Sequence, residues 1–474
     1  MSPSEGSQDG STPEPMHTSP PAVYTEPEVP DPFLIDDEDS GGEEPGEVAA
    51  ATESQHVLAP VPLATPPSPV PLATPISPTL TANRNKDVPP PPSEDSDQDE
   101  APELYLPGLC IPTMFLPIPN TDPLTTLVNK YIHPPTSRPL RDLNGEWQRT
   151  DFHTLVMSNS WRSLARMARD RIVTSDPEDL NLILGLWYLR LSSLARMRLF
   201  NQTTAECTNL FSLLNTIEPP SNRQWLFDNI LPFELEVMYA RLKYWTGDHM
   251  GYLDALHALL HKCKTRSRRA KGDSNVVAMW KERGARVCLI MASQLVEMKD
   301  FAAAAKLLEP LCRQGADVPV PATRSAIARI HLQSGNLAAA TLHIAQVAAD
   351  PTAPPAMKLM NAALLAAAEG EDANATELLS GILAEDADNY VAVNNLCVTL
   401  LSQGRLKEGI EVMERALKAH PESVVIAEPF LFNLSTLYEL RSSTAIENKR
   451  NLLIEVAKWS GDGLKTACLK MPSN

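Results

Sequence analysis

Three side chains that can bind metals stand close together at His257, His261 and Cys263. Histidines four residues apart lie on one face of a helix and can share a metal ion. A zinc-protease motif would also need a glutamate directly after the first histidine, and Ala258 occupies that position. Because helix packing alone accounts for this stretch, we predict no metal site and no cofactor here.

A second candidate for chemistry is the run Gly463-Leu464-Lys465-Thr466, which superficially suggests a phosphate-binding loop. In such a loop a glycine directly precedes the lysine and a strand feeds the turn, and neither condition is met. The sequence also contains no GxSxG elbow, no GxGxxG after a strand and no carboxylate pair in a strand-built pocket. These observations predict a protein that is not an enzyme.

A structural repeat explains most of the chain better than any catalytic motif does. Residues 390–421 contain a helix, a turn at Gly404 and a second helix that ends at Pro421. Apolar residues follow one face of the first helix, and the small residues Gly409 and Ala416 mark close crossings on the second. This spacing is typical of the tetratricopeptide repeat, which has a period of about 34 residues.

Three earlier segments repeat this pattern in register. The turn position is occupied by Gly370, Gly335 and Lys299, and the small residue that follows is Ala375, Ala340 or Ala304. One helical hairpin cannot bury its apolar face alone, so neighbouring hairpins must stack. We therefore predict an all-α fold, a tetratricopeptide-repeat α-solenoid preceded by a long disordered tail.

The charge of the protein is distributed unevenly. The formal net charge of the chain is −18, but residues 1–104 contain 21 acidic side chains and only two basic ones, Arg84 and Lys86. The remaining residues hold 38 acids and 39 bases, so the folded part is close to neutral. This balance argues against nucleic acid as a partner and against binding to an acidic membrane surface.

The first 104 residues form a compositionally distinct segment. They contain 22 of the 43 prolines, together with acidic runs at 36–44 and 94–100 and a tandem nine-residue repeat at 61–78. Such a segment buries too little apolar surface to offset its ordering entropy, so we predict a disordered tail. Seven Ser-Pro or Thr-Pro pairs leave two interpretations open, a solvated spacer or a tail regulated by phosphorylation.

The rest of the chain divides into five predicted parts. An apolar, proline-broken segment at 105–140 must lie against a surface, and we favour the chain's own solenoid over a partner. N-terminal helical repeats follow at 141–264, with long helices expected at 151–173 and 180–200 and a third at 204–217. A basic loop is predicted at 265–275, the repeat array at 276–421 and capping helices at 422–474, which would cover the open end of the rod.

The compartment can be inferred from the cysteines and from hydropathy. Seven cysteines without a CxxC pair, together with an acidic N-terminus lacking a secretory signal, predict a reducing compartment. The longest apolar run is far shorter than the 18 or so residues needed to span a bilayer, so no direct membrane insertion is expected. We predict a cytoplasmic protein.

Surface recognition is then the remaining function. The first helix of each repeat should line a concave face, and most residues predicted to point into it are apolar rather than the basic residues of a carboxylate-binding groove. An apolar face favours a stable partner over a transient peptide. The predicted partner-binding residues are Met357, Met360, Leu364, Val391, Asn394, Val398 and Leu401. The basic loop could instead meet an acidic partner or only solvent, through Arg266, Arg268, Arg269 and Lys271.

Three segments resemble a known family. They are 287–301 with Trp280, the unit at 386–409, and above all 422–443 with its FNLSTLYEL run. Over about residues 150–470 the chain resembles the trafficking protein particle (TRAPP) complex subunit 12 family, also called tetratricopeptide repeat protein 15. The acidic tail matches poorly, so nothing is transferred to it.

The resemblance implies a non-catalytic scaffold or adaptor subunit of a TRAPP III-type vesicle tethering complex. Such a complex acts as a guanine-nucleotide exchange factor for a Rab GTPase in traffic from the endoplasmic reticulum to the Golgi and in autophagy. The implied partners are other TRAPP subunits, especially the large peripheral ones, in a stable hetero-complex associated peripherally with the Golgi. The alternative is a co-chaperone-type adaptor that binds peptides, which the absence of a basic groove disfavours.

Overall fold

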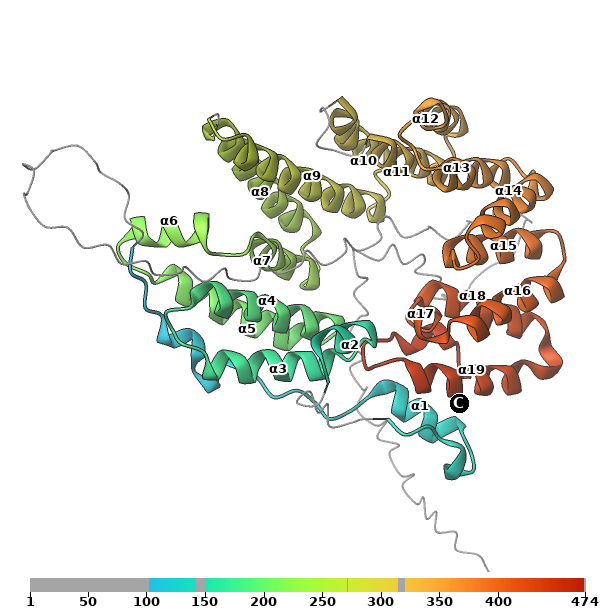
Figure 1. The fold of residues 1–474 in the computed structure, drawn as a ribbon, viewed down its shortest axis with the longest axis horizontal. Helices are drawn as coiled ribbons and strands as arrows, with labels where there is room; N and C mark the ends of the chain where they lie inside the picture. The colour runs from blue at the N-terminus through green and yellow to red at the C-terminus, as the bar shows by residue number, and fades with distance from the viewer. Residues whose placement is uncertain (1–101, 142–149, 271, 314–319, 473–474) are drawn as a thin grey trace, which may run out of the picture.

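The computed structural model describes residues 102–141, 150–270, 272–313 and 320–472 (Figure 1). Within these ranges all regular elements are α-helices or short 3₁₀ helices, and no strand is present. The predicted all-α solenoid is therefore confirmed. Residues 1–101, on which the prediction of a disordered tail rests, lie outside the described residues. Lys271 of the predicted basic loop lies outside them as well.

Four helix pairs form the regular array. They are α9 (Ser274–Glu297) with α10 (Phe301–Leu308), α11 (Val320–Gln333) with α12 (Leu337–Ala349), α13 (Pro355–Ala368) with α14 (Asp372–Glu385), and α15 (Tyr390–Ser402) with α16 (Leu406–Ala419). The short 3₁₀ helix η4 (Glu309–Arg313) extends α10. In Figure 1, α9, α11 and α13 lie along the inside of an arc and α12 lies on its outside.

The turns of the array follow the predicted register. Gly335, Gly370 and Gly404 have φ values of +74°, +80° and +74°, a conformation that glycine adopts without steric cost. Lys299 occupies the same turn position with φ +63° although it carries a side chain. The alanines after these turns are fully buried where the two helices cross, as Ala340 and Ala375 illustrate.

The helices before the array extend the same winding. They are α2 (Phe152–Met157), α3 (Trp161–Thr174), α4 (Leu180–Arg196), α5 (Phe200–Asn215), α6 (Pro220–Asn229), α7 (Phe233–Trp245) and α8 (His249–Arg269). The single helix expected at 151–173 is wrong, because Asn159 adopts φ +55° and separates α2 from α3. Asparagine tolerates this left-handed conformation better than most residues do.

The predicted basic loop is helical over much of its length. Helix α8 continues through Arg269, so the expectation of a loop beginning at residue 265 is wrong. Lysine and arginine are good helix formers, and no glycine or proline occurs between Gly251 and Gly272. Basic side chains in the last turn also interact favourably with the negative end of the helix dipole.

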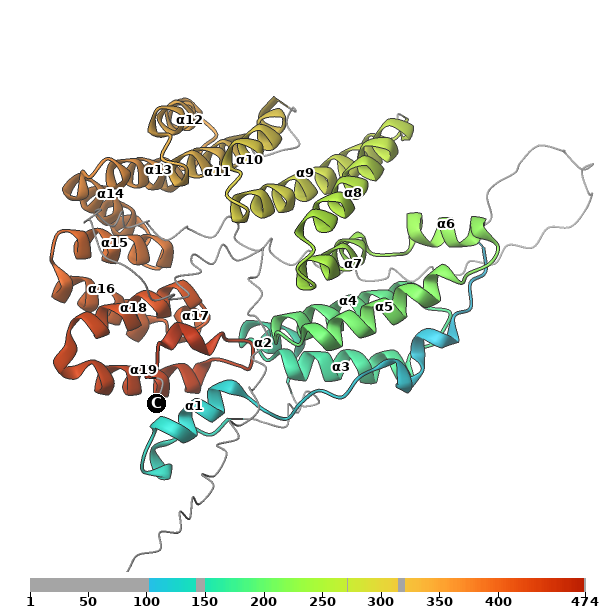
Figure 2. The same cartoon turned by 180° about the vertical axis from the view of Figure 1, so that it is seen from behind.

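Residues 102–141, here called the strap, run along the outside of the other helices. The strap contains η1 (Pro107–Cys110), η2 (Pro112–Met114), α1 (Pro123–Tyr131) and η3 (Pro135–Ser137). Leu109 packs in the core of α3–α7, whereas Leu124, Val128 and Ile132 pack in the core of the C-terminal helices. The strap therefore spans the two ends of the solenoid, as Figure 2 shows from behind.

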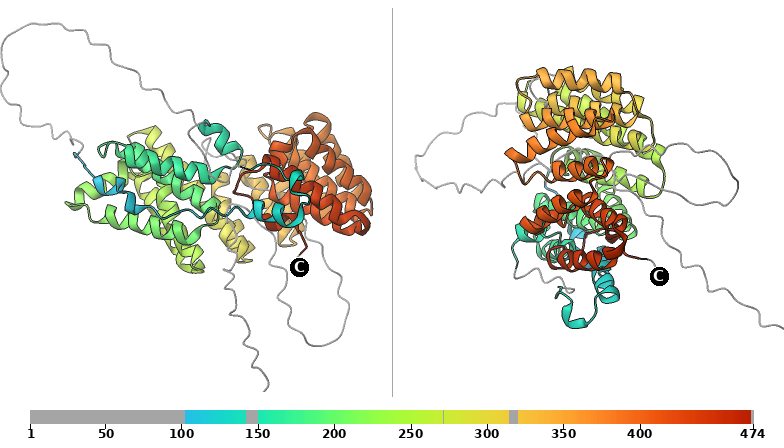
Figure 3. Two further views of the ribbon diagram at one scale, coloured as in Figure 1. Left: turned by 90° about the horizontal axis from the view of Figure 1, so that it is seen from below. Right: turned by 90° about the vertical axis from the view of Figure 1, so that its right-hand side faces the viewer.

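The C-terminal helices complete the arc. They are α17 (Pro421–Val424), α18 (Glu428–Leu440) and α19 (Ala445–Trp459), with η5 (Ser442–Thr444) and η6 (Thr466–Leu469). They cover the last repeat, and they also contact α1 and the residues before α3, so they do not end an open rod. Figure 3 shows the cyan α1 beside the red C-terminal helices in both of its views.

Candidate interaction surfaces

The strap is anchored to the N-terminal helices by a buried ion pair. Arg190 of α4 donates to both carboxylate oxygens of Glu206 in α5 at 2.7 and 2.6 Å, and both side chains are almost completely buried. Arg190 also donates to the carbonyl oxygen of Leu116 in the strap, while Glu206 accepts from the backbone N–H of the same residue. Buried charges are stable only when they are fully hydrogen-bonded. The backbone of Leu116 supplies two of the bonds that this ion pair needs, so the pair holds the strap in place.

An aromatic contact reinforces that anchor. The rings of Phe115 and Trp187 stack with centroids 4.7 Å apart, and the Arg190 guanidinium lies 5.0 Å from the centre of the Phe115 ring. The indole N–H of Trp187 donates to the carbonyl oxygen of Leu109. The prolines here begin two short 3₁₀ helices, η1 and η2, instead of a long α-helix, so several backbone polar groups have no partner within a helix and can bond to other segments.

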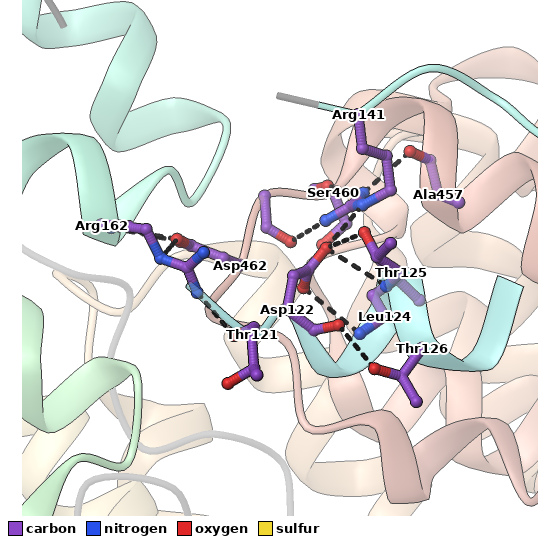
Figure 4. Close-up of polar contacts among 11 residues, drawn as sticks. Thr121, Asp122, Leu124, Thr125, Thr126, Arg141, Arg162, Ala457, Ser460 and Asp462 are labelled. Carbon is purple, nitrogen blue, oxygen red and sulfur yellow. Dashed lines mark hydrogen bonds and ion pairs between the residues drawn. The ribbon is translucent and has the colours of Figure 1, made fainter. Parts of the chain in front are cut away.

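A second polar cluster, here called the clasp, joins the strap and the start of α3 to the loop that follows α19. It consists of Asp122 and Arg141 from the strap, residues 158–162 around the start of α3, and the loop at 460–463 (Figure 4). Asp122 caps α1 by accepting from the N–H groups of Leu124 and Thr125. Arg141 pairs with Asp122 at 2.8 Å.

The guanidinium of Arg141 also satisfies carbonyl oxygens at the C-terminal end of α19. It donates to Ala457, Ser460 and Gly461 at 2.8, 2.6 and 2.9 Å. The last carbonyls of a helix have no partner within the helix, so a cation placed there provides both hydrogen bonds and a favourable charge for the dipole. The strap thereby holds α19 through its backbone.

The other half of the clasp connects α3 with the 460–463 loop. The backbone N–H of Gly461 donates to Ser158 at 2.7 Å, and that of Asp462 donates to Asn159 at 3.2 Å. Arg162 forms an ion pair with Asp462 and donates to the carbonyl oxygen of Thr121. A Cβ at Gly461 would lie 2.3 Å from the Asn159 carbonyl oxygen, so only glycine fits without backbone movement.

Two carboxyl groups of the clasp are shifted in opposite directions. Burial alone raises the pKa of Asp122, but Arg141, Thr125 and the N–H of Leu124 favour the ionised form and bring the pKa below its usual range. Burial raises the pKa of Asp462, and Arg162 offsets this only partly. The ionised form of Asp122 therefore stabilises the fold, whereas that of Asp462 is disfavoured.

The residues first considered for metal or phosphate binding do not form such a site among the described residues. Cys263 is buried, which raises the pKa of its thiol to about 11, whereas His257 and His261 are exposed. No group of three or more potential metal ligands occurs among the residues that the structure describes. Gly463, from the run that resembled a phosphate loop, lies where a Cβ would stand 2.1 Å from the ring of Trp161.

Two of the seven predicted partner-binding residues are buried in the core. Met360 and Leu364 are only 6% and 8% exposed and pack in the core of the array with Leu379 and Leu396. The other five are half-buried: Met357, Val391, Asn394, Val398 and Leu401. Val398 and Leu401 pack against the core formed by the C-terminal helices.

Polar contacts between the inner helices explain the asparagines. Ser325 of α11 donates to Asn361 of α13 at 2.7 Å, and Asn395 of α15 lies 3.3 Å from the sulfur of Met360. Asn394 accepts from Asn433 of α18 at 2.9 Å. These bonds connect each inner helix to the next. The apolar pattern within one repeat does not predict them, because both partners come from different repeats.

The basic residues remain at the surface. Arg266 pairs with Asp228 of α6, and Lys262 pairs with Glu236 of α7 at 2.7 Å. Arg268 and Arg269 are exposed in the last turn of α8. In the described ranges, no helix is both long and apolar enough to cross a bilayer.

The fold and these contacts define a tetratricopeptide-repeat protein whose two ends are joined through the clasp. The chain matches the tetratricopeptide repeat family over residues 364–427. It is 29% identical over 316 residues to "Trafficking protein particle complex subunit 12" of Homo sapiens and of Mus musculus. These matches include 61% of this chain, 42% of the human protein and 39% of the mouse protein, which supports the resemblance to that family.

Proposed function

We propose that this chain is a subunit of a TRAPP-type complex in which it serves as a scaffold. The observation that carries the proposal is the similarity over 316 residues to subunit 12 of that complex in two mammals. The helical-repeat architecture is consistent with a scaffold, because stacked hairpins present extended surfaces to other proteins. We further propose that the chain is not catalytic and that nucleic acid is not its partner.

The finer assignment is part of the same proposal. The complex would be of the TRAPP III type and would act as an exchange factor for a Rab GTPase in traffic between the endoplasmic reticulum and the Golgi and in autophagy. The partners would be the large peripheral subunits, in a stable hetero-complex. The chain would be cytoplasmic and peripherally associated with the Golgi. None of these roles requires a reaction centre in this chain.

The inner face of the arc near α9 is the first surface to test. Leu289 is 37% exposed there, and Arg286 beside it pairs with Glu282 on the same helix and faces Glu234 at 3.9 Å. Both residues lie on the first helix of a repeat, the helix expected to line the concave face, and unlike Met360 and Leu364 they are accessible. A substitution at Leu289 can therefore remove an interaction without removing core packing.

The experiment is a pull-down of the tagged full-length chain from native cytosol, with bound proteins identified by mass spectrometry. We expect the natural chain to recover the other TRAPP subunits and Leu289→Glu with Arg286→Glu to reduce their recovery. Leu342→Glu on the outer helix α12, where Leu342 is 59% exposed, is the matched control and should leave recovery unchanged. Recovery of chaperones without any TRAPP subunit would contradict the proposal and favour a peptide-binding adaptor.

A further inference from the structure

Two hollows lie side by side where the strap begins. The first has a volume of about 350 Å³ and is enclosed by residues 103–109 of the strap and the end of α5, reaching Asn222 in α6. The second, here called the basic groove, has a volume of about 480 Å³ and lies between α6 and the last turns of α8. Arg223, the residue after Asn222, belongs to its lining. Figures 1 and 2 both show the start of the strap beside α6.

The basic groove carries an excess of positive charge. Its lining includes Arg223, Lys262, Arg266 and Arg269 but only one carboxylate, that of Asp228. Asp228 is paired with Arg266, and Lys262 is paired with Glu236. Arg223 donates to the carbonyl oxygen of Asn215. Neither Arg223 nor Arg269 has a carboxylate within ion-pair distance among the residues that the structure describes, so two guanidinium groups are available to an anion.

The sequence places an acidic segment directly before this groove. Residues 94–100, EDSDQDE, contain five carboxylates in seven positions and end two residues before the strap begins at residue 102. We propose that this acidic run binds the basic groove of its own chain, with its carboxylates on Arg223 and Arg269. Phe227 and Thr265, which also line the groove, would contact the side chains that lie between these carboxylates.

Chain geometry supports the chain's own acidic run over a separate partner. Glu103 shares the first hollow with Asn222, so the chain enters next to the groove. The five carboxylates precede Glu103 by three to nine residues, which corresponds to a reach of roughly 10–30 Å in an extended chain. A short tether gives an effective concentration on the order of millimolar, far above that of a free acidic peptide in the cell.

A peptide competition on the full-length protein tests this proposal without involving any complex. The probe is a fluorescein-labelled peptide of residues 91–103, and binding is followed by fluorescence anisotropy at low salt. A neutralised chain carries Glu94→Gln, Asp95→Asn, Asp97→Asn, Asp99→Asn and Glu100→Gln. We expect it to bind the probe about tenfold or more tightly than the natural chain, whose own run competes for the groove.

Groove variants made in the neutralised chain locate the site. Arg223→Glu with Arg269→Glu should abolish probe binding, and the milder Arg223→Gln with Arg269→Gln should weaken it if charge reversal impairs folding. Arg415→Glu with Lys418→Glu, two exposed positions on α16, is the matched control and should retain binding. Equal affinity of the natural and neutralised chains would overturn the proposal, as would an equal loss in the control pair. Equal affinity of the natural and neutralised chains, together with loss of binding in the groove variants, would indicate that the groove binds a separate acidic partner.

Discussion

The repeat array and the clasp are built from contacts of different range. In the array each helix packs on its neighbours in sequence, and small residues such as Ala340 and Ala375 allow close crossings. In the clasp, Arg141 reaches carbonyl oxygens 316 to 320 residues away. The array depends on many similar apolar contacts, whereas the clasp depends on a few specific polar ones. The difference implies that single substitutions should affect the two regions in different ways.

The largest effect is expected where the strap is anchored. Arg190→Met should destabilise the protein by about 3–5 kcal/mol, because it leaves the Glu206 carboxylate buried without its partner. Adding Glu206→Leu should recover much of this loss, since an apolar pair of similar volume leaves no buried charge. Urea unfolding followed by circular dichroism measures both values. If the double variant is no more stable than Arg190→Met, the anchor depends on the strap bonds rather than on charge pairing.

The contact between the 460–463 loop and residues 158–159 in the clasp can be tested by replacing two glycines separately. Gly461→Ala should cost about 1–3 kcal/mol because its Cβ would meet backbone atoms of Asn159 and Ser158. Gly381→Ala is the control, since a Cβ there meets nothing within 4 Å, and alanine in the interior of α14 should stabilise by about 0.5–1 kcal/mol. Thermal unfolding should separate the two variants. Hydrogen exchange should rise at residues 158–162 only in Gly461→Ala.

The clasp should also confer a specific pH dependence. The folded pKa of Asp122 lies below its unfolded value, so its stabilisation is complete above the unfolded pKa, about 3.9, and is lost as pH falls through the folded pKa. Asp122→Asn should cost about 1 kcal/mol at neutral pH because the charge-assisted bonds become ordinary ones. Stability curves from pH 7 to pH 2 should converge for the two proteins at the acidic end. Parallel curves would mean that the loss in Asp122→Asn does not depend on ionisation of the Asp122 carboxyl group.

The smallest effect concerns a turn in the array. Lys299 holds φ +63° where the other turns have glycine, so Lys299→Gly removes steric strain while increasing the freedom of the unfolded chain. We expect a net stabilisation of about 0.5 kcal/mol. Chemical unfolding of this variant beside Gly335→Ala, which should lose about 1 kcal/mol, checks the sign. A loss in Lys299→Gly would mean that the lysine side chain has a stabilising contact.

The array could be predicted from sequence because its contacts are local. The turn register at Gly335, Gly370 and Gly404 follows from periodicity, since each hairpin packs on adjacent segments. The same periodicity misassigned Met360 and Leu364, because it locates a helix face but not the neighbouring repeat that covers it. Superhelical curvature decides whether that face is open, and curvature depends on small rotations accumulated over many repeats.

The clasp could not be predicted for a related reason. Asp122, Arg141 and Arg162 are ordinary polar residues in sequence, and nothing in their spacing indicates the loop at 460–463. Gly461 and Gly463 were the available signal, since two glycines after a helix can mark close backbone approach rather than a phosphate loop. The helix break at Asn159 could not be predicted from periodicity, because apolar residues continue on both sides of it.

Joining the two ends has a consequence for how the protein is made. Synthesis proceeds from the N-terminus, so the strap emerges long before its partners in α19 and the 460–463 loop, one of which lies 316 residues later in the chain. The apolar side of α1, with Leu124 and Val128, therefore remains without its native cover until α18 and α19 have been synthesised. Chains that stop before α18 would leave that side of α1 exposed, so an exposed α1 distinguishes them from chains that contain the C-terminal helices.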